Sequence, residues 1–123
     1  MKKILIVDDE DHIRALVSAT IGIGTYEVFE AKNGDEAIEV ARREKPDLIF
    51  LDIGMPRMDG FEVCRRLRED PVTSSAHITI LTAYGQDEDK KRSTEVGADD
   101  YFIKPFSPTA LLDKVTDVLE KTG

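Results

Sequence analysis

The chain lacks the residues that would cross-link it or hold it in a membrane. It has one cysteine, Cys64, so no internal disulfide can form, a usage compatible with a reducing cytosol. No apolar run approaches the roughly 20 residues of a membrane-spanning helix. The N-terminus has a continuous run of only four apolar residues, Ile4–Val7, before an acidic run, which is too short and too acidic for a signal peptide. We therefore expect a cytoplasmic protein with no membrane segment.

Positive charge and zinc ligands are also scarce. Lysine and arginine number 17 against 25 aspartates and glutamates, which gives a formal net charge of −8. Binding to a phosphate backbone needs a basic footprint, so we expect no direct contact with nucleic acid. The histidines, His12 and His77, are isolated in the sequence, and nothing suggests a zinc site.

The composition is that of one soluble domain. The chain has 123 residues, of which 41% are hydrophobic and 34% charged, and a chain of this length can bury an ordinary core. Without a repeat, a low-complexity tract or a linker, we expect a single domain over residues 1–123.

Short apolar runs alternate along the chain with segments of helical periodicity. Continuous runs at Lys3–Val7, Leu48–Leu51 and Ile78–Leu81 are typical of strands covered on both faces. Tyr26–Ala31 alternates and suits a more exposed strand, and Tyr101–Ile103 is the fifth strand. Helices are predicted between and after these strands. An alternation of this kind indicates a parallel sheet with helices on both faces.

The predicted helices differ in strength. The segment Gln86–Val96 is the weakest because it has almost no apolar face. The last helix begins after Ser107-Pro108, a cap followed by a proline at the first helical position. Five strand–helix units are too few for a closed eight-stranded barrel. We therefore predict an α/β fold with a doubly wound open sheet, whose ligand crevice lies at the carboxyl ends of the strands.

Polar residues follow four of the five predicted strands. They are Asp8-Asp9, Asp52, Thr82 and Lys104. Each has an ordinary alternative: the first acids could cap a helix, Asp52 could form a turn before Gly54, and Thr82 and Lys104 could be unremarkable surface residues. Their joint position at strand ends favours a common site, because the carboxyl ends of parallel strands meet at one edge.

Charge balance suggests what this site would hold. Asp8, Asp9 and Asp52 carry three negative charges, which a divalent cation and Lys104 together would neutralise. Oxygen ligands and retained waters suit Mg²⁺. A metal-neutralised carboxylate beside a lysine suits phosphoryl transfer, and aspartate can accept a phosphoryl group covalently.

Four motifs then resemble one family over essentially the whole chain. They are ILIVDDE at Ile4–Glu10, LDIGMPRMDG at Leu51–Gly60, LTA at Leu81–Ala83 and GADDYFIKPF at Gly97–Phe106. In this order they resemble the receiver domain of bacterial two-component response regulators. The resemblance implies a flavodoxin-like fold with strand order 2-1-3-4-5, five helices on both faces, and a phosphorylation-dependent signalling switch.

The resemblance also implies roles for single residues around the phosphoryl group. Asp52 resembles the phosphoacceptor, which would bind Mg²⁺ together with Asp8, Asp9 and the backbone carbonyl of Gly54. Gly54 also stands at a position that tunes phosphoryl lifetime in the family, as does Tyr84.

Further positions resemble the family's phosphoryl contact and switch. Lys104 resembles the lysine that contacts the phosphoryl oxygens, and Pro105 stands where a cis peptide often aims that lysine. Thr82 resembles the hydroxyl that moves to the phosphoryl group, and Tyr101 the aromatic that swings inward after it. His77 departs from the family, which often has proline there.

The implied partner is a sensor histidine kinase or a phosphotransfer protein, which donates the phosphoryl group. Signal output would use the face formed by the helix at 86–96, the strand at 101–103 and the last helix. There Lys90–Arg92 could pair with Asp99, Asp100 and Asp113 of a second copy, giving a phosphorylation-dependent homodimer. An alternative is that the chain is the receiver part of a longer DNA-binding transcriptional regulator.

Two other functions compete with the switch. A Mg²⁺-dependent phosphohydrolase would usually have an acidic residue two positions after its aspartate nucleophile, where this chain has Gly54. A flavin-binding protein would need a phosphate loop after the first strand, and the acidic crevice would repel the flavin phosphate. We therefore expect no enzyme beyond weak self-phosphotransfer and autodephosphorylation.

Overall fold

The computed structural model describes residues 2–22, 26–82, 87–104 and 107–120, and the side chains of all of these except residues 87 and 88. Strands and helices alternate along these ranges. The strands are β1 (Lys3–Val7), β2 (Glu27–Ala31), β3 (Leu48–Asp52), β4 (His77–Thr82) and β5 (Asp100–Ile103). The helices are α1 (Asp11–Ile21), α2 (Gly34–Glu44), α3 (Gly60–Glu69), α4 (Asp87–Glu95) and α5 (Pro108–Leu119).

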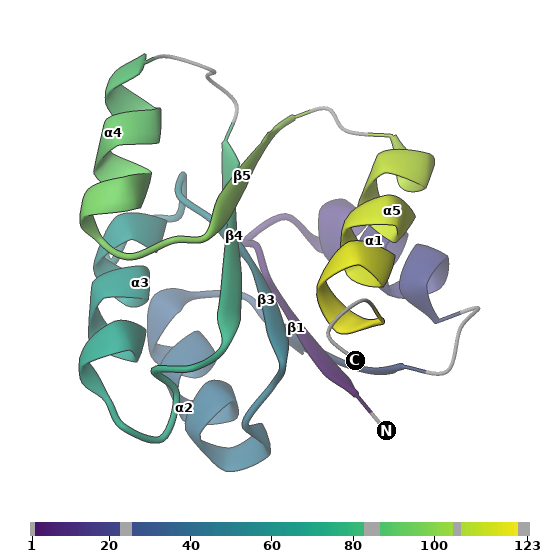
Figure 1. The fold of residues 1–123 in the computed structure, drawn as a ribbon, viewed down its shortest axis with the longest axis horizontal. Helices are drawn as coiled ribbons and strands as arrows, with labels where there is room; N and C mark the ends of the chain where they lie inside the picture. The colour runs from purple at the N-terminus through teal and green to yellow at the C-terminus, as the bar shows by residue number, and fades with distance from the viewer. Residues whose placement is uncertain (1, 23–25, 83–86, 105–106, 121–123) are drawn as a thin grey trace.

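The strands form one parallel sheet in the order β2-β1-β3-β4-β5. Helices α1 and α5 cover one face, and α2, α3 and α4 lie on the other (Figure 1). This confirms the predicted doubly wound fold and its strand order. The order reverses between β1 and β3, which is where such sheets bind ligands.

The apolar runs are explained by burial on both faces of the sheet. In β1, Leu5 and Val7 belong to the core cluster under α2 and α3, whereas Ile4 and Ile6 belong to the cluster under α1 and α5. All four side chains are fully buried. The edge strand β2 keeps exposed residues, in agreement with its alternating pattern.

Several edges of the predicted strands shift by one residue, among them the end of the third strand at Asp52 and both ends of the fourth, which spans His77–Thr82. The second strand begins at Glu27 rather than Tyr26, and the fifth begins at Asp100 because this residue pairs with Thr79 of β4. Helix α5 begins as expected, with the Ser107 side chain accepting a hydrogen bond from the Ala110 backbone at 3.0 Å.

Helix α4 has little apolar anchoring, as its sequence predicts. Its one buried side chain within the described part of the helix is Ser93, whose hydroxyl donates to the Asp89 backbone carbonyl at 2.7 Å. Val96 and Ala98, just after the helix, pack against the core. None of the described helices is both long and apolar enough to cross a membrane.

Candidate functional site

A cavity of about 380 Å³ lies at the carboxyl ends of the strands. Its lining includes Asp9, Asp52, Thr82 and Lys104, which sequence reasoning assigned to one site, and Asp89 from α4, which it did not. Asp8 lies directly behind this lining, fully buried and paired with Lys104. The topology brings these residues together because the ends of four parallel strands meet at this edge.

Asp52 is the last residue of β3 and is 5% exposed. Its Oδ1 accepts a hydrogen bond from the backbone N–H of Gly54 at 3.1 Å and lies 3.4 Å from Lys104 Nζ. The first of these contacts is the turn that the ordinary alternative predicts. Asp52 is therefore a turn residue and a cavity residue at once, and the two interpretations do not exclude each other.

Asp8 is held by four contacts. Its Oδ2 lies 2.8 Å from Lys104 Nζ, and its Oδ1 accepts from the backbone N–H of Glu10 at 3.0 Å. Its own backbone donates to Ala31 at 3.1 Å and accepts from Arg14 Nη1 at 2.6 Å. A carboxylate with no exposure needs such partners to offset the loss of its hydration, and these contacts hold Asp8 in place behind the cavity.

Lys104 joins the two buried carboxylates. Its backbone N–H donates to Thr82 O at 2.7 Å, which continues the β4–β5 pairing. Its side chain, 15% exposed, reaches Asp8 and Asp52 from there. Burial alone would lower the pKa of Lys104, but its hydrogen bond to Asp8 and the charges of both carboxylates outweigh it and raise that pKa.

Burial has the opposite effect on Asp52. Desolvation is the largest cause that raises the pKa of Asp52, from 3.8 to about 6, and the charge of Asp8 raises it further. The Gly54 N–H and Lys104 act against this rise. Burial is therefore a larger cause of the rise than repulsion between the carboxylates.

The acidic residues after β1 form a group that could hold a cation. Carboxylate oxygens of Asp8, Asp9 and Glu10 lie within 4.8 Å of one another. Asp9 and Glu10 are exposed, whereas Asp8 is buried. Glu10 is the N-cap residue of α1 and makes no side-chain cap, so capping does not account for this group. An oxygen-only donor set fits Mg²⁺.

Thr82 and Tyr101 lie on the neighbouring strands β4 and β5, and Thr82 lines the cavity. Thr82 ends β4, is 1% exposed, and its Oγ1 lies 3.4 Å from Asp89 Oδ2. Tyr101 is half-buried against the core, and Lys90 Nζ lies 5.3 Å from the centre of its ring. The predicted roles of Tyr84 and Pro105 concern positions outside the described residues.

Sequence reasoning missed Glu10 and Asp89. Glu10 continues the acidic run after β1, and that adjacency was a usable signal. Asp89 reaches the cavity from a helix rather than from a strand end. A rule that considers only strand ends cannot find it.

Two of the carboxylates predicted to pair with a second copy, Asp99 and Asp100, already have partners within the chain. Asp100 Oδ2 lies 2.9 Å from Lys114 Nζ and 3.1 Å from His77 Nε2. Asp99 Oδ2 lies 2.6 Å from Arg68 Nη2. A dimer that used Asp99 or Asp100 would have to share or replace these contacts.

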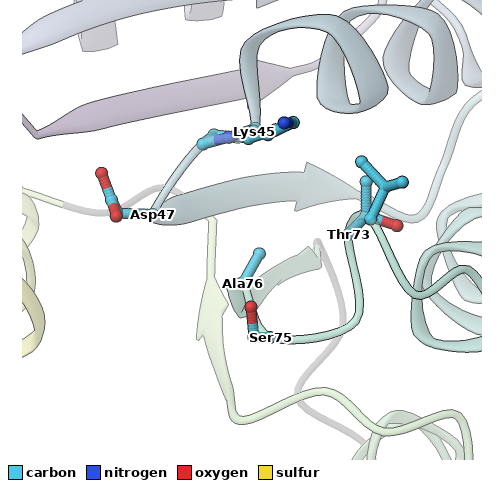
Figure 2. A pocket seen from close by; sticks show the side chains of 7 residues that line it. Lys45, Asp47, Thr73, Ser75 and Ala76 are labelled. Atoms are coloured by element: carbon cyan, nitrogen blue, oxygen red, sulfur yellow. The ribbon is translucent and has the colours of Figure 1, made fainter.

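A second cavity, of about 130 Å³, lies at the opposite edge of the sheet, before β3 and β4 (Figure 2). The Asp47 carboxylate accepts from the Lys3 backbone at 2.9 Å, and the Thr73 hydroxyl donates to Leu67 O at 2.7 Å. The side chains of Lys45 and Asp47 point apart. These groups serve the fold and do not converge on a ligand.

Replacing Gly60 with alanine is expected to destabilise the site's framework. Helix α3 begins at Gly60 so close to β3 that an added Cβ would lie 2.4 Å from the Asp52 carbonyl oxygen. The backbone of Asp52 or the start of α3 must then move. We expect Gly60→Ala to lower the free energy of unfolding by about 1–3 kcal/mol, the usual range for overpacking, measured by urea denaturation.

The matched control is Gly54→Ala. A Cβ at Gly54 would lie 3.6 Å from Asp52 Oδ1, an ordinary van der Waals distance. This variant should stay within about 0.5 kcal/mol of the wild type. Equal losses in both variants would show that close packing at Gly60 is not the cause.

Comparison with known proteins identifies relatives over nearly the whole chain. The family model described as "Response regulator receiver domain" matches residues 4–116. The phosphate regulon transcriptional regulatory protein PhoB of Pseudomonas aeruginosa is 45% identical over 122 residues, which are 99% of this chain and 53% of that protein. The probable transcriptional regulator ycf27 of Pyropia yezoensis is 45% identical over 120 residues, 98% of this chain and 48% of that protein.

Solved structures agree with the sequence relatives. The chemotaxis protein CheY4 of Vibrio cholerae superposes with a TM-score of 0.92 at 38% identity, covering 97% of this chain and 99% of that one. A two-component response regulator from Clostridium difficile gives a TM-score of 0.91 at 30% identity, covering 98% of each chain. The chain thus spans about half the length of the curated relatives named above and nearly all of these two solved chains.

Proposed function

The chain belongs to the response regulator receiver domains, and on this basis we propose that it works as a switch through phosphorylation of Asp52. The observation that carries the proposal is the placement of Asp52. Its side chain lines the cavity and is 5% exposed. It lies beside the largely buried ammonium of Lys104, in the same site as the acidic group of Asp8, Asp9 and Glu10 that could hold a cation. Asp8 is fully buried behind it, and Asp9 is exposed.

The contacts of Asp52 support its role as the nucleophile. Among the described residues, both of its contacts engage Oδ1, the oxygen near the Gly54 N–H and Lys104 Nζ, which leaves Oδ2 for reaction. With a pKa of about 6, the carboxylate is mostly ionised at pH 7.5. Oδ2 forms the bond to phosphorus while the bond from phosphorus to the donor histidine breaks. The electron pair stays on the leaving imidazole nitrogen, which takes up a proton.

Mg²⁺ is the proposed cofactor. Asp8, Asp9 and Asp52, with the backbone carbonyl of Gly54, are its proposed ligands, and Glu10 lies in the same acidic group. When bound, the cation supplies charge neutralisation that lets an anionic phosphoryl group approach a carboxylate. Lys104 adds a positive charge beside both Asp8 and Asp52, supported by its raised pKa.

The phosphoryl group then changes the hydrogen bonding around the cavity. It replaces one negative charge with roughly two and adds oxygens that need donors. Lys104 Nζ and the Thr82 hydroxyl are proposed donors, and movement of Thr82 gives Tyr101 room to turn inward. The proposed output face is α4, β5 and α5. Beyond self-phosphotransfer and slow autodephosphorylation we propose no enzymatic activity.

The test is incubation with acetyl phosphate and Mg²⁺, followed by intact mass spectrometry. The wild type should gain one phosphoryl group, and the gain should be lost in Asp52→Asn and in EDTA. Asp35→Asn, which neutralises an exposed carboxylate of α2, should be phosphorylated like the wild type. No gain in the wild type with metal present, or a gain in Asp52→Asn, would contradict the proposal.

The phosphoryl donor is proposed to be a sensor histidine kinase or a phosphotransfer protein, and the output a second copy of this chain. The PhoB and ycf27 relatives are named as transcriptional regulators, which supports a role for the chain as the receiver part of such a regulator. On the proposed face, Ile103 is 47% exposed and Leu112 is 39% exposed. Their apolar area would be covered in a dimer.

Sedimentation with and without beryllofluoride, a phosphoryl mimic, tests the dimer. We expect the mass to double with the mimic and Mg²⁺. Leu112→Asp should abolish the doubling, whereas Leu16→Asp should keep it, because Leu16 is equally exposed but lies on α1. A mass that does not change with the mimic would rule out a phosphorylation-driven dimer.

A further inference from the structure

Asp89 is a cavity residue that the proposed phosphorylation does not use. It lies in the first turn of α4 and lines the same cavity as Asp52 and Lys104. Its Oδ2 is 3.4 Å from Thr82 Oγ1, with the hydroxyl as donor. Thr82 is 1% exposed, so this contact lies in a largely dehydrated place, where hydrogen bonds to charged acceptors are stronger than in water.

The next residue of α4 contacts the other switch residue. Lys90 Nζ lies 5.3 Å from the centre of the Tyr101 ring, within the range of a cation–π interaction. Two consecutive residues of one helical turn therefore contact Thr82 and Tyr101. Within its described part, α4 has no buried apolar side chain, so these polar contacts help to decide where its first turn lies.

We propose that Asp89 is a positioning residue that holds Thr82 in the unphosphorylated arrangement, and that the phosphoryl group must take the Thr82 hydroxyl from it. This inference rests on the proposed function of Asp52. A hydroxyl has a single proton to donate, so Thr82 cannot serve Asp89 and a phosphoryl oxygen together. The phosphoryl group is the stronger acceptor because it carries about two negative charges.

The loss of this contact would link the chemistry to the output face. A phosphoryl group and the Asp89 carboxylate would share one cavity as like charges, and the repulsion between them favours movement of the first turn of α4 away from Asp52. Lys90 moves with that turn and leaves the Tyr101 ring. The hydroxyl contact and the ring contact therefore break together, and α4 and β5 change in one step.

Affinity for beryllofluoride in the presence of Mg²⁺ tests the proposal. Asp89→Ala removes the competing acceptor, and we expect it to bind the mimic about threefold to tenfold more tightly, the effect of one net hydrogen bond. Asp89→Asn keeps an acceptor oxygen and should lie closer to the wild type than to the alanine variant. Glu95→Ala, which removes an exposed carboxylate from the other end of α4, should bind like the wild type.

The decisive test compares Asp89→Ala in the wild-type and Thr82→Val backgrounds. Valine keeps the shape of threonine and removes the hydroxyl, so the effect of Asp89→Ala should shrink there to the part that comes from charge repulsion alone. A full effect that persists in Thr82→Val would overturn the proposal, because the charge of Asp89 would then act directly on the mimic. Equal affinities of Asp89→Ala and Glu95→Ala would also overturn it.

A structural readout does not depend on the mimic. In the free protein, Asp89→Ala should move the amide NMR signals of β5 partway toward their mimic-bound positions, and Glu95→Ala should not. Unmoved β5 signals would count against the proposal. If the wild type neither bound the mimic nor gained a phosphoryl group, the proposed function itself would fail. If the wild type responds to the mimic but Asp89→Ala changes neither the affinity nor the β5 signals, only this inference would fail.

Discussion

Replacing Asp52 with asparagine is expected to stabilise the protein by about 3 kcal/mol at pH 7.5 in EDTA. The wild-type carboxylate is buried beside the fixed charge of Asp8, and its pKa rises from 3.8 to about 6. Each unit of pKa shift corresponds to about 1.4 kcal/mol of free energy between the two protonation states. Asparagine keeps the shape and an oxygen for the Gly54 N–H, and it has no charge to bury.

The sign of the effect gives it a defined pH window. Below pH 3.8, Asp52 is protonated in both the folded and unfolded states, so it makes no contribution to the difference in stability between the two proteins. Between about pH 4 and pH 6 the unfolded chain has lost this proton while the folded protein keeps it, so wild-type stability falls as the pH rises. Asparagine does not titrate. The gain should therefore be small at pH 4, grow to about pH 6 and stay constant above it.

Urea denaturation of both proteins from pH 4 to pH 8 measures this difference. The control is Asp9→Asn, which removes a charge from the same cavity where it is exposed and should change stability by no more than about 0.5 kcal/mol. Equal stability of Asp52→Asn and the wild type at pH 7.5 would show that Asp52 is not strained by burial. Functional sites often contain residues that lower stability but are needed for activity, so a protein that becomes more stable when a cavity carboxylate is removed fits this pattern.

The apolar runs predicted the sheet because burial on both faces leaves little choice of residue. β1 and β3 lie at the centre of the sheet and read as unbroken apolar segments. Once five parallel strands are predicted, the meeting of Asp52, Thr82 and Lys104 at one edge follows from topology. That is why a single sequence could predict most of the cavity lining.

What the sequence could not supply depends on side-chain packing. Asp89 lies in a helix without an apolar stripe, so no pattern fixes which face of α4 turns toward the cavity. The partners of Asp99 and Asp100 depend on where the side chains of Arg68, Lys114 and His77 reach. These three residues lie on three different elements, α3, α5 and β4. The pKa of Asp52 likewise depends on burial, which a charge count does not measure.

Replacing Lys104 with methionine is expected to destabilise the protein by about 3 kcal/mol at pH 7.5 in EDTA. Methionine keeps most of the length of the side chain and loses the ammonium that lies 2.8 Å from Asp8 and 3.4 Å from Asp52. Removing one partner of a buried ion pair leaves the other charge uncompensated, at a typical cost of 3–5 kcal/mol. Because the pKa of Lys104 is raised above its ordinary 10.5, its stabilising charge is fully present at pH 7.5.

A double-mutant cycle with Asp8 separates the pair from simple packing. In the Asp8→Asn background one of the two buried carboxylates is already neutral, so Lys104→Met should cost clearly less than it does alone. The cost should also shrink toward pH 5, because carboxylates without the ammonium take up protons at higher pH. A cost that is the same in both backgrounds and at both pH values would indicate lost packing of the lysine stem instead.

Divalent cation then tests the charge balance of the whole site. If Asp8, Asp9 and Asp52 hold Mg²⁺ as proposed, the cation replaces part of the positive charge that Lys104→Met removes. Mg²⁺ should therefore stabilise Lys104→Met more than the wild type, in which ammonium and cation repel each other, while Asp52→Asn should gain least because it has lost a proposed ligand. Equal gains in all three proteins would mean that the cation binds away from the buried carboxylates, and the proposed ligand set would have to be abandoned.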